Sequence, residues 1–292
     1  YPLRRQRQMC IRDSHLMYAR FFTKALADVG VAPAGLREPF QRLFTQGMIR
    51  LGGTKMSKSR GNLVAPEEIL DDQGADALRL AHLQVKPPQE DVDWEDFGID
   101  GCAKFLARVW RLAVPGSDLS AKARTGEITE ADTEVDRTTH RLVARITDEY
   151  DRWSYNTAVA GFMEFTTMLY RYVQTDDGPH TATLEAAVDA LLQVMAPAAP
   201  HLCAELWERR RGGHVHLEAW PEADPTKLID DMVTMVIQVN GKVRDRVEVS
   251  ADLDEAEAEA TALASERVQT ALAGGEPRKV ITRPPRLVNV VV

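Results

Sequence analysis

The chain has 292 residues, of which 44% are hydrophobic, and its formal net charge is -8 at pH 7. This length predicts about two domains with buried cores, and the negative charge argues against a protein that coats nucleic acid generally, although local basic patches can still hold a folded RNA. The three cysteines form no C-x-x-C pair, no apolar run reaches the roughly 18–20 residues of a membrane span, and no secretory signal is visible, so we expect a soluble cytoplasmic protein without a membrane partner.

The first fourteen residues differ in character from the rest. They contain Arg4, Arg5, Arg7 and Arg12 with little apolar periodicity. A basic targeting peptide is one interpretation. A non-native segment left by cloning or assembly fits better, and such segments are excluded from fold reasoning.

Residues 15–65 combine a predicted helix with a polar loop. Apolar residues recur at helical spacing over 16–26, and Gly30 then interrupts the pattern. A second group of apolar residues predicts a short helix over 40–44.

Two lysines lie three residues apart in residues 52–62, which we call the lysine loop. Its centre is Lys55-Met56-Ser57-Lys58-Ser59, with glycines on both sides. A loop of this kind can move and close its two ammonium groups over a polyphosphate. Five specified residues in this order are expected by chance in roughly one of 10^4 chains of this size, which disfavours an ordinary solvated loop. Asn62 is interpreted as a turn residue.

Residues 66–115 predict helices on either side of an acidic segment. Pro66 is placed to begin a helix, 75–83 continues it, and Pro87-Pro88 ends it. The acidic segment is interpreted as a helix entry or a solvated turn. It contains Asp91, Asp93, Glu95 and Asp96.

Long amphipathic periodicity from Asp136 to Trp207 predicts four helices that pack as an antiparallel bundle. Asn156 is a candidate cap for the second helix. His201, directly after Pro200, is interpreted as a helix-start residue rather than a catalyst.

The period changes to two after residue 232, which predicts strands over 233–239 and 242–249 joined by an Asn-Gly hairpin turn. An acidic helix over 252–273 and two short strands complete an α+β module of about sixty residues. His214 and His216 are predicted to lie on one strand face, without the further ligands that a metal site needs.

Several stretches together resemble one family. Besides the central pentapeptide, they are QGMIR (46–50), GADALRL (74–80), PPQEDVDW (87–94), FLARVW (105–110), MAPAAPHL (195–202), ELW (205–207) and RLVNVVV (286–292). The pentapeptide resembles the second signature of class I aminoacyl-tRNA synthetases. In this order the stretches are similar to the leucyl-tRNA synthetase family rather than to its valyl, isoleucyl or methionyl relatives, from about His15 to Val292.

This resemblance implies a multidomain, mainly α-helical protein. Residues 15–65 would be the end of a Rossmann catalytic domain, and 66–115 connecting helices that contact the tRNA stem. Residues 116–228 would form the anticodon-binding helical bundle, and 229–292 an α+β domain that binds tRNA.

The activity implied by the resemblance is ATP-dependent ligation of leucine to tRNA-Leu by a monomer. Lys55 and Lys58 would be catalytic, with Lys58 the stronger candidate, and Met56, Ser57 and Ser59 would join them in binding ATP. ATP would act with Mg2+, and no metal site is expected in this chain.

The resemblance also implies that the C-terminal module contacts tRNA phosphates and sugars. A solvated surface is the alternative interpretation of its cations. The candidates are Lys242, Arg244, Arg246, Arg278, Lys279, Arg283 and Arg286.

The first class I signature, His-x-Gly-His, does not occur in the chain, and neither does the family's editing domain. We therefore expect a C-terminal fragment that is inactive alone. A free-standing tRNA-binding module and a valyl or isoleucyl synthetase are the alternatives.

Overall fold

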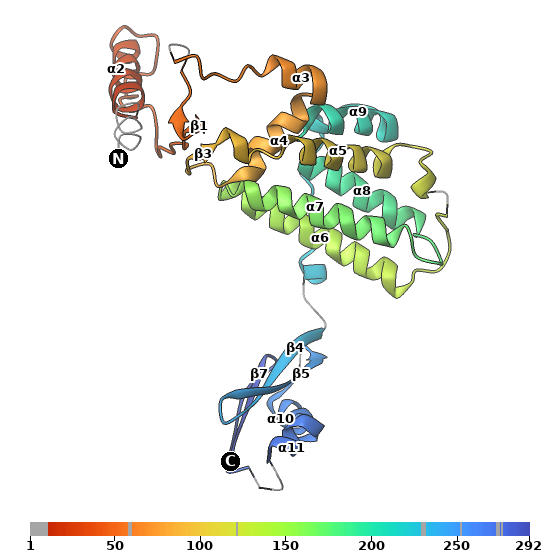
Figure 1. Cartoon of the computed structure of the whole chain (residues 1–292). Helices are drawn as coiled ribbons and strands as arrows, with labels where there is room; N and C mark the ends of the chain where they lie inside the picture. The colour runs from red at the N-terminus through yellow and green to blue at the C-terminus, as the bar shows by residue number, and fades with distance from the viewer. Residues whose placement is uncertain are drawn as a thin grey trace. The chain divides into compact units, whose positions relative to one another are not determined.

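The computed structural model describes residues 11–57, 60–120, 122–228, 232–251, 253–272, 275 and 277–292. Its chain divides into two compact units, Tyr1–Ala223 and Asp224–Val292, which are described separately below (Figure 1). Within the described residues, none of the helices is both long enough and apolar enough to cross a membrane.

Among the described residues before the lysine loop, helical structure is limited to residues 11–28. A π-helix, η1 (Ile11–Ala19), leads into α2 (Arg20–Asp28), so helical structure includes the end of the segment expected to be foreign. The short helix predicted over 40–44 is wrong, because those residues form bends and chain without regular secondary structure. Phe44 instead packs against Trp153, with 4.5 Å between the ring centroids, so a tertiary contact replaces the local helix.

A small sheet and three helices follow. The sheet has the order β2-β1-β3 and is built from β1 (Ile49–Leu51), β2 (Thr54–Lys55) and β3 (Val92–Asp93). Between β2 and β3 lie α3 (Glu67–Gln73) and α4 (Ala75–Val85). The sequence predicted helix here, but as one continuous helix, whereas Gly74 at φ 81° separates the two. After β3 come the 3-10 turn η3 (Trp94–Asp96) and α5 (Ile99–Ala113).

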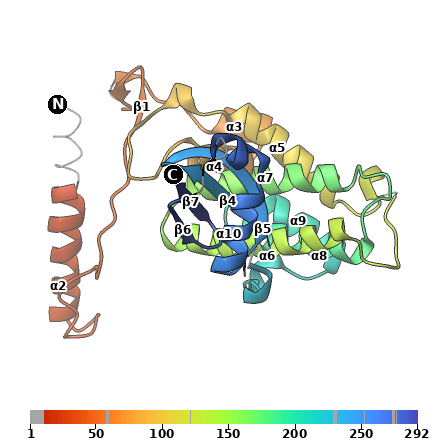
Figure 2. The ribbon, with the colours of Figure 1, turned by 90° about the horizontal axis from the view of Figure 1, so that it is seen from below.

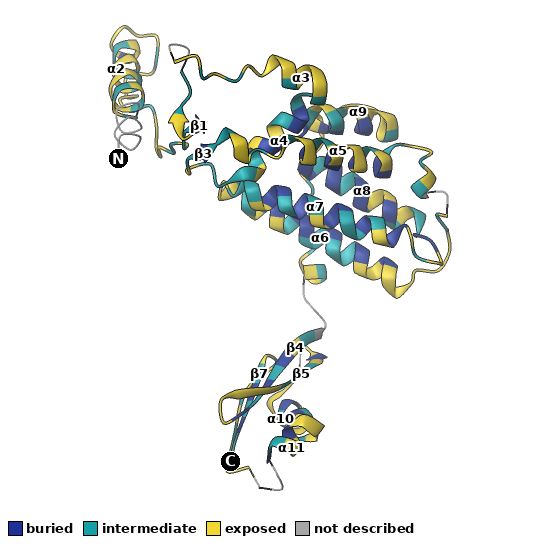
Figure 3. Ribbon diagram, viewed as in Figure 1, coloured by how far each residue is buried: buried dark blue, intermediate teal, exposed yellow. Residues whose placement is uncertain are grey.

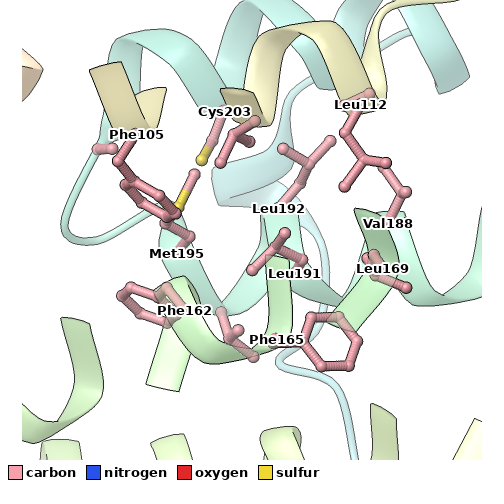
Figure 4. Close-up of a cluster of buried hydrophobic side chains, with 14 of the residues drawn as sticks. Phe105, Leu112, Phe162, Phe165, Leu169, Val188, Leu191, Leu192, Met195 and Cys203 are labelled. Carbon is pink, nitrogen blue, oxygen red and sulfur yellow. The ribbon is translucent and has the colours of Figure 1, made fainter. Parts of the chain in front are cut away.

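The four-helix prediction is confirmed by α6 (Glu130–Asp151), α7 (Tyr155–Tyr172), α8 (Thr181–Met195) and α9 (Pro200–Arg211). Figure 3 shows the buried sides of these helices turned inward and their exposed sides turned to solvent. Together with α4 and α5 they enclose one core, part of which is drawn in Figure 4. Each large side chain buried there contributes about 1.5–3 kcal/mol, so this core supplies most of the stability of the first unit.

The helix ends differ in part from expectation. Asn156 is not a cap, because α7 begins one residue earlier and Ser154 occupies the N-cap position. The start of α6 is held by a capping box, in which Thr129 and Asp132 bond to each other's backbone N–H groups.

Asp132 is also the centre of a buried polar cluster. Besides the Thr129 backbone N–H and hydroxyl at 2.7 and 2.8 Å, its carboxylate accepts hydrogen bonds from the Arg124 guanidinium and the Tyr172 hydroxyl. These donors hold the pKa of Asp132 far below its usual range, although burial acts in the opposite direction. The Asp132 side chain is 0% exposed, so the cluster stabilises the bundle from within.

The second unit is an α+β sandwich. Its sheet has the order β5-β4-β7-β6. The strands are β4 (Met232–Val239), β5 (Lys242–Ser250), β6 (Lys279–Arg283) and β7 (Leu287–Val291). The helices α10 (Glu255–Ala264) and α11 (Glu266–Leu272) cover one face of the sheet (Figures 1 and 2).

Two local predictions can be compared with this unit. The hairpin turn is confirmed, with Asn240 and Gly241 at φ 50° and 78°. The single helix predicted over 252–273 is wrong, because Ser265 is extended and separates α10 from α11. The Ser265 hydroxyl donates to the Asp245 carboxylate at 2.6 Å, so a contact with β5 accompanies the break.

Candidate functional site

The lysine loop extends from a β-hairpin. β1 and β2 pair antiparallel, with Arg50 opposite Lys55, and Gly52 and Gly53 make the turn at φ 57° and 71°. These left-handed angles explain why glycines stand there. Lys55 is half-buried at the end of β2. Lys58 and Ser59, both predicted to bind ATP, lie outside the described residues.

Asn62 closes the neck of the loop. Its amide nitrogen donates to the Thr54 hydroxyl and to the Lys55 carbonyl oxygen, both at 3.2 Å, and its amide oxygen accepts from the Ser57 backbone N–H at 3.0 Å. Asn62 therefore bonds to three residues on the other side of the loop. The interpretation as a simple turn residue understated this role, because the bonds join residues five to eight positions apart.

The base of the hairpin is pinned by the acidic segment that follows α4. β3 pairs parallel to β1 and places Asp93 beside Arg50, and the two side chains form an ion pair at 2.8 Å. The prediction of a helix entry or solvated turn is therefore wrong for Asp93, which lies in a strand. The contact joins residues 43 positions apart, so no local signal could have revealed it.

Gly47 permits the close approach of these strands. A Cβ atom placed on Gly47 would lie 1.9 Å from the backbone carbonyl oxygen of Glu90. No side chain fits at that distance, and a backbone atom cannot easily give way. Gly47 is thus a structural requirement of the site.

The seven predicted RNA-contacting cations are distributed over more than one face of the second unit. All seven are exposed. The alternation of β5 is shifted by a bulge near Arg244, so Lys242 pairs with buried Val239 whereas Arg246 pairs with Val236 on the opposite face. Residues that pair directly share a face, so Lys242 and Arg246 point to opposite sides of the sheet.

The face away from the helices is basic at its edges and aliphatic at its centre. Arg246 stands on β5 at one edge, and Lys279 and Arg283 stand on β6 at the other, on the side opposite the buried Val288 and Val290. Their face also carries the exposed Glu248, next to Arg246 on β5, together with Val236, Gln238, Ile281, Leu287 and Asn289. Among the described residues of this unit, the helix side carries most of the acidic groups, including Glu255, Glu257 and Glu266.

The histidines considered as candidates from the sequence, His201, His214 and His216, contact other side chains of the protein. His201 lies in the first turn of α9, and its Nδ1 is 2.8 Å from the Asp76 carboxylate, which also accepts the Leu202 backbone N–H at 2.7 Å. His214 caps a 3-10 turn, Val215–Leu217, and His216 lies within that turn rather than on a strand; their rings stack at 5.4 Å. Within the described ranges, no group of three metal-ligating side chains is present.

The buried thiols are inert near neutral pH. Burial raises the pKa of Cys102 to about 11. Burial, together with the nearby Asp76 carboxylate, raises the pKa of Cys203 well above its usual value. Both thiols stay protonated, and neither is a candidate nucleophile.

Comparison with known proteins identifies two family matches. Residues 16–95 match the family described as tRNA synthetases class I (I, L, M and V), and residues 132–260 match the anticodon-binding domain of tRNA ligase. The first match contains the lysine loop and the acidic segment that pins it.

Individual relatives agree with these families. A leucine–tRNA ligase of Symbiobacterium thermophilum is 42% identical, and one of Lawsonia intracellularis is 38% identical, each over 95% of this chain. The chain spans 36% and 34% of the lengths of these relatives, about one third of each.

Solved structures share the fold. A LeuRS of Agrobacterium radiobacter, in a ternary complex with tRNA and LeuAMS, superimposes with a TM-score of 0.79 at 29% identity, over 96% of this chain and 37% of its own. A methionyl-tRNA synthetase of Mycobacterium tuberculosis, with methionyl-adenylate, gives a TM-score of 0.51 at 21% identity, over 69% of this chain and 42% of its own. The second likeness concerns the fold alone.

Proposed function

We propose that this chain is part of an enzyme that joins leucine to tRNA-Leu with ATP. The chain belongs to the class I tRNA synthetases, and the relatives that it matches are leucine–tRNA ligases. The observation that carries the proposal is the pinned lysine loop in a chain that matches leucine–tRNA ligases over 95% of its length. We place the reaction in the cytoplasm and expect the enzyme to act as a monomer.

The chemistry assigned to the lysine loop is charge stabilisation. When the leucine carboxylate attacks the α-phosphate of MgATP, pyrophosphate leaves and negative charge builds on its oxygens. Cations held near those oxygens lower the barrier more than they tighten ground-state binding. We assign this role to Lys55 and Lys58, with Met56, Ser57 and Ser59 completing the ATP contacts.

The chain alone is proposed to lack catalytic competence. Holding the ATP phosphates also requires the histidines of the first signature, and no His-x-Gly-His occurs in the sequence. The lysine loop therefore works with residues that this chain does not contain. ATP–pyrophosphate exchange catalysed by the purified chain would contradict this part of the proposal.

The RNA-binding role is assigned to the bundle and to the second unit. We propose that tRNA meets the face of the sheet away from α10 and α11, through phosphate and sugar contacts that position RNA without reading its sequence. Arg246, Lys279 and Arg283 share that face, whereas Lys242 does not. Neutralising Arg246 and Arg283 is expected to lower the salt slope of tRNA binding by roughly 0.7–0.9 per cation, and Lys242→Gln serves as the matched control.

A grafted ligase tests the proposed reaction. Residues 15–292 would replace the matching part of the Symbiobacterium thermophilum ligase, and exchange would be measured with leucine and charging with the leucine, valine and isoleucine tRNAs. The host ligase supplies the part of the active site that this chain lacks, so the choice among tRNAs reports on this chain. We expect tRNA-Leu to be preferred. Preference for the valine or isoleucine tRNA would favour another branched-chain synthetase, and tRNA binding without any turnover would favour a free-standing binding module.

A further inference from the structure

We propose that Asp91, Asp93 and Glu95 are positioning residues for the lysine loop, an inference that rests on the proposed function of Lys55. These three carboxylates, which we call the carboxylate ladder, belong to the acidic segment for which the sequence predicted no contacts. Asp93 lies in β3, Asp91 directly precedes this strand, and Glu95 lies in the 3-10 turn η3 that follows it.

Each carboxylate of the ladder accepts a hydrogen bond from a different residue along the first half of the hairpin. Asp91 accepts the Met48 backbone N–H at 2.8 Å. Asp93 accepts from the Arg50 guanidinium at 2.8 Å, and Glu95 accepts the Gly52 backbone N–H at 3.0 Å. The ladder therefore follows the entire β1 strand, one bond at every second residue, up to the turn where the lysine loop begins.

Asp93 has the most direct effect on Lys55. The pairing of the strands places Asp93, Arg50 and Lys55 in one row across β3, β1 and β2. Like charges directly opposite each other on paired strands repel, so Arg50 would disturb Lys55 without a counter-charge. The Arg50 and Asp93 side chains are only 22% and 33% exposed, which limits screening by water. Asp93 thus draws the guanidinium to itself and neutralises it beside the proposed catalytic lysine.

The ladder is itself fixed to the helical body. Trp94 and Phe97 follow β3 and stack on each other at 5.0 Å, and the Phe97 ring lies 4.7 Å from the His82 ring on α4. α4 is fixed to the α8–α9 connection by Arg79, whose guanidinium donates to the Pro197 carbonyl oxygen at 2.8 Å. The hairpin base is therefore held to packed helices.

A positioning role and a local packing role predict different results. If the ladder only stabilises its own bonds, removing one carboxylate affects the N–H group it touches and little else. If it positions the loop, the effect extends beyond Met48, Arg50 and Gly52, to which the three carboxylates bond, and reaches Lys55 and Ser57 across the hairpin.

Hydrogen–deuterium exchange on the 292-residue chain tests the ladder without any catalytic assay. Asp91→Asn, Asp93→Asn and Glu95→Gln are compared with Asp96→Asn, which alters an exposed neighbouring carboxylate that has no hydrogen-bond partner among the described residues. Loss of one charge-assisted bond is expected to raise amide exchange over 47–57 about tenfold, with α6–α9 unchanged. Exchange that rises at only the directly bonded amide, or equally in Asp96→Asn, would overturn the proposal.

The grafted ligase tests the catalytic consequence. Asp93→Asn is expected to lower kcat for ATP–pyrophosphate exchange about tenfold, with the leucine KM and the tRNA Kd unchanged. The swap of Arg50→Asp with Asp93→Arg is expected to recover most of this loss, which a general folding defect would not allow. Equal kcat in Asp93→Asn and Asp96→Asn, or no recovery by the swap, would overturn the positioning role.

The two proposals fail in distinguishable ways. An unsubstituted graft without leucine-dependent exchange refutes the proposed function, and the catalytic consequence with it. Hydrogen exchange still decides whether the ladder holds the loop. If the graft is active and the ladder variants change neither amide exchange nor kcat, only the positioning role of the ladder is refuted.

Discussion

Replacing Asp132 by Asn tests whether the buried polar cluster stabilises the bundle. The substitution keeps the shape of the side chain but removes its charge and one of its two acceptor oxygens. Bonds to a charged group contribute about 1.5–3 kcal/mol each, and an unpaired buried donor costs about 1–3 kcal/mol. Because Arg124, Tyr172 and Thr129 all donate to this carboxylate, we expect a loss of about 3 kcal/mol.

Thermal unfolding of the chain, followed by circular dichroism, measures this loss. For a unit of this size, about 3 kcal/mol corresponds to a fall in Tm of about 6–12 °C. Glu130→Gln is the matched control, since it removes an exposed carboxylate from the same helix turn and should change stability by less than about 1 kcal/mol. Equal Tm values for the two variants would refute the reasoning.

The same cluster predicts a pH dependence with a definite sign. The pKa of Asp132 is lowered in the folded chain, so its stabilisation is present above the unfolded pKa of about 4. That stabilisation is lost as pH falls below this value toward the folded pKa. Below about pH 4, wild type should lose stability more steeply than Asp132→Asn, and parallel curves in urea unfolding would contradict the assignment.

Three further substitutions have distinct expected results. Gly47→Ala should lower the free energy of unfolding by about 1–3 kcal/mol through a clash with backbone. Gly101→Ala, at an exposed position of α5 with no atom within 4 Å of the added Cβ, should be neutral or stabilising in the same urea titration. Asn62→Ala should raise amide exchange at Ser57 about five- to tenfold, because it removes the bonds across the loop neck, and unchanged exchange would argue against that closure. In the grafted ligase, Lys55→Ala should lower kcat for ATP–pyrophosphate exchange on the order of 10^2- to 10^3-fold, and a change confined to KM would argue against transition-state stabilisation.

Local patterns predicted most helices and strands correctly. Helical periodicity identified α6 to α9 because each buries one continuous stripe, and the alternation on both sides of Asn240-Gly241 identified the hairpin. Predictions failed where a distant contact decided the local conformation. The ring of Phe44 packs on Trp153 in place of a helix over 40–44, and Ser265 bonds to Asp245 where a single long helix was expected.

The sequence by itself determined the family resemblance, the lysine loop with its flanking glycines and the division into a helical and an α+β part, because these depend on residue order and local periodicity. Tertiary structure decided how those features are used. It placed Asp93 beside Arg50 across 43 positions, joined Asp76 to His201 across 125, and through one bulge directed Lys242 and Arg246 to opposite faces. Strand register and helix packing alone determine such contacts, and neither can be read from one segment at a time.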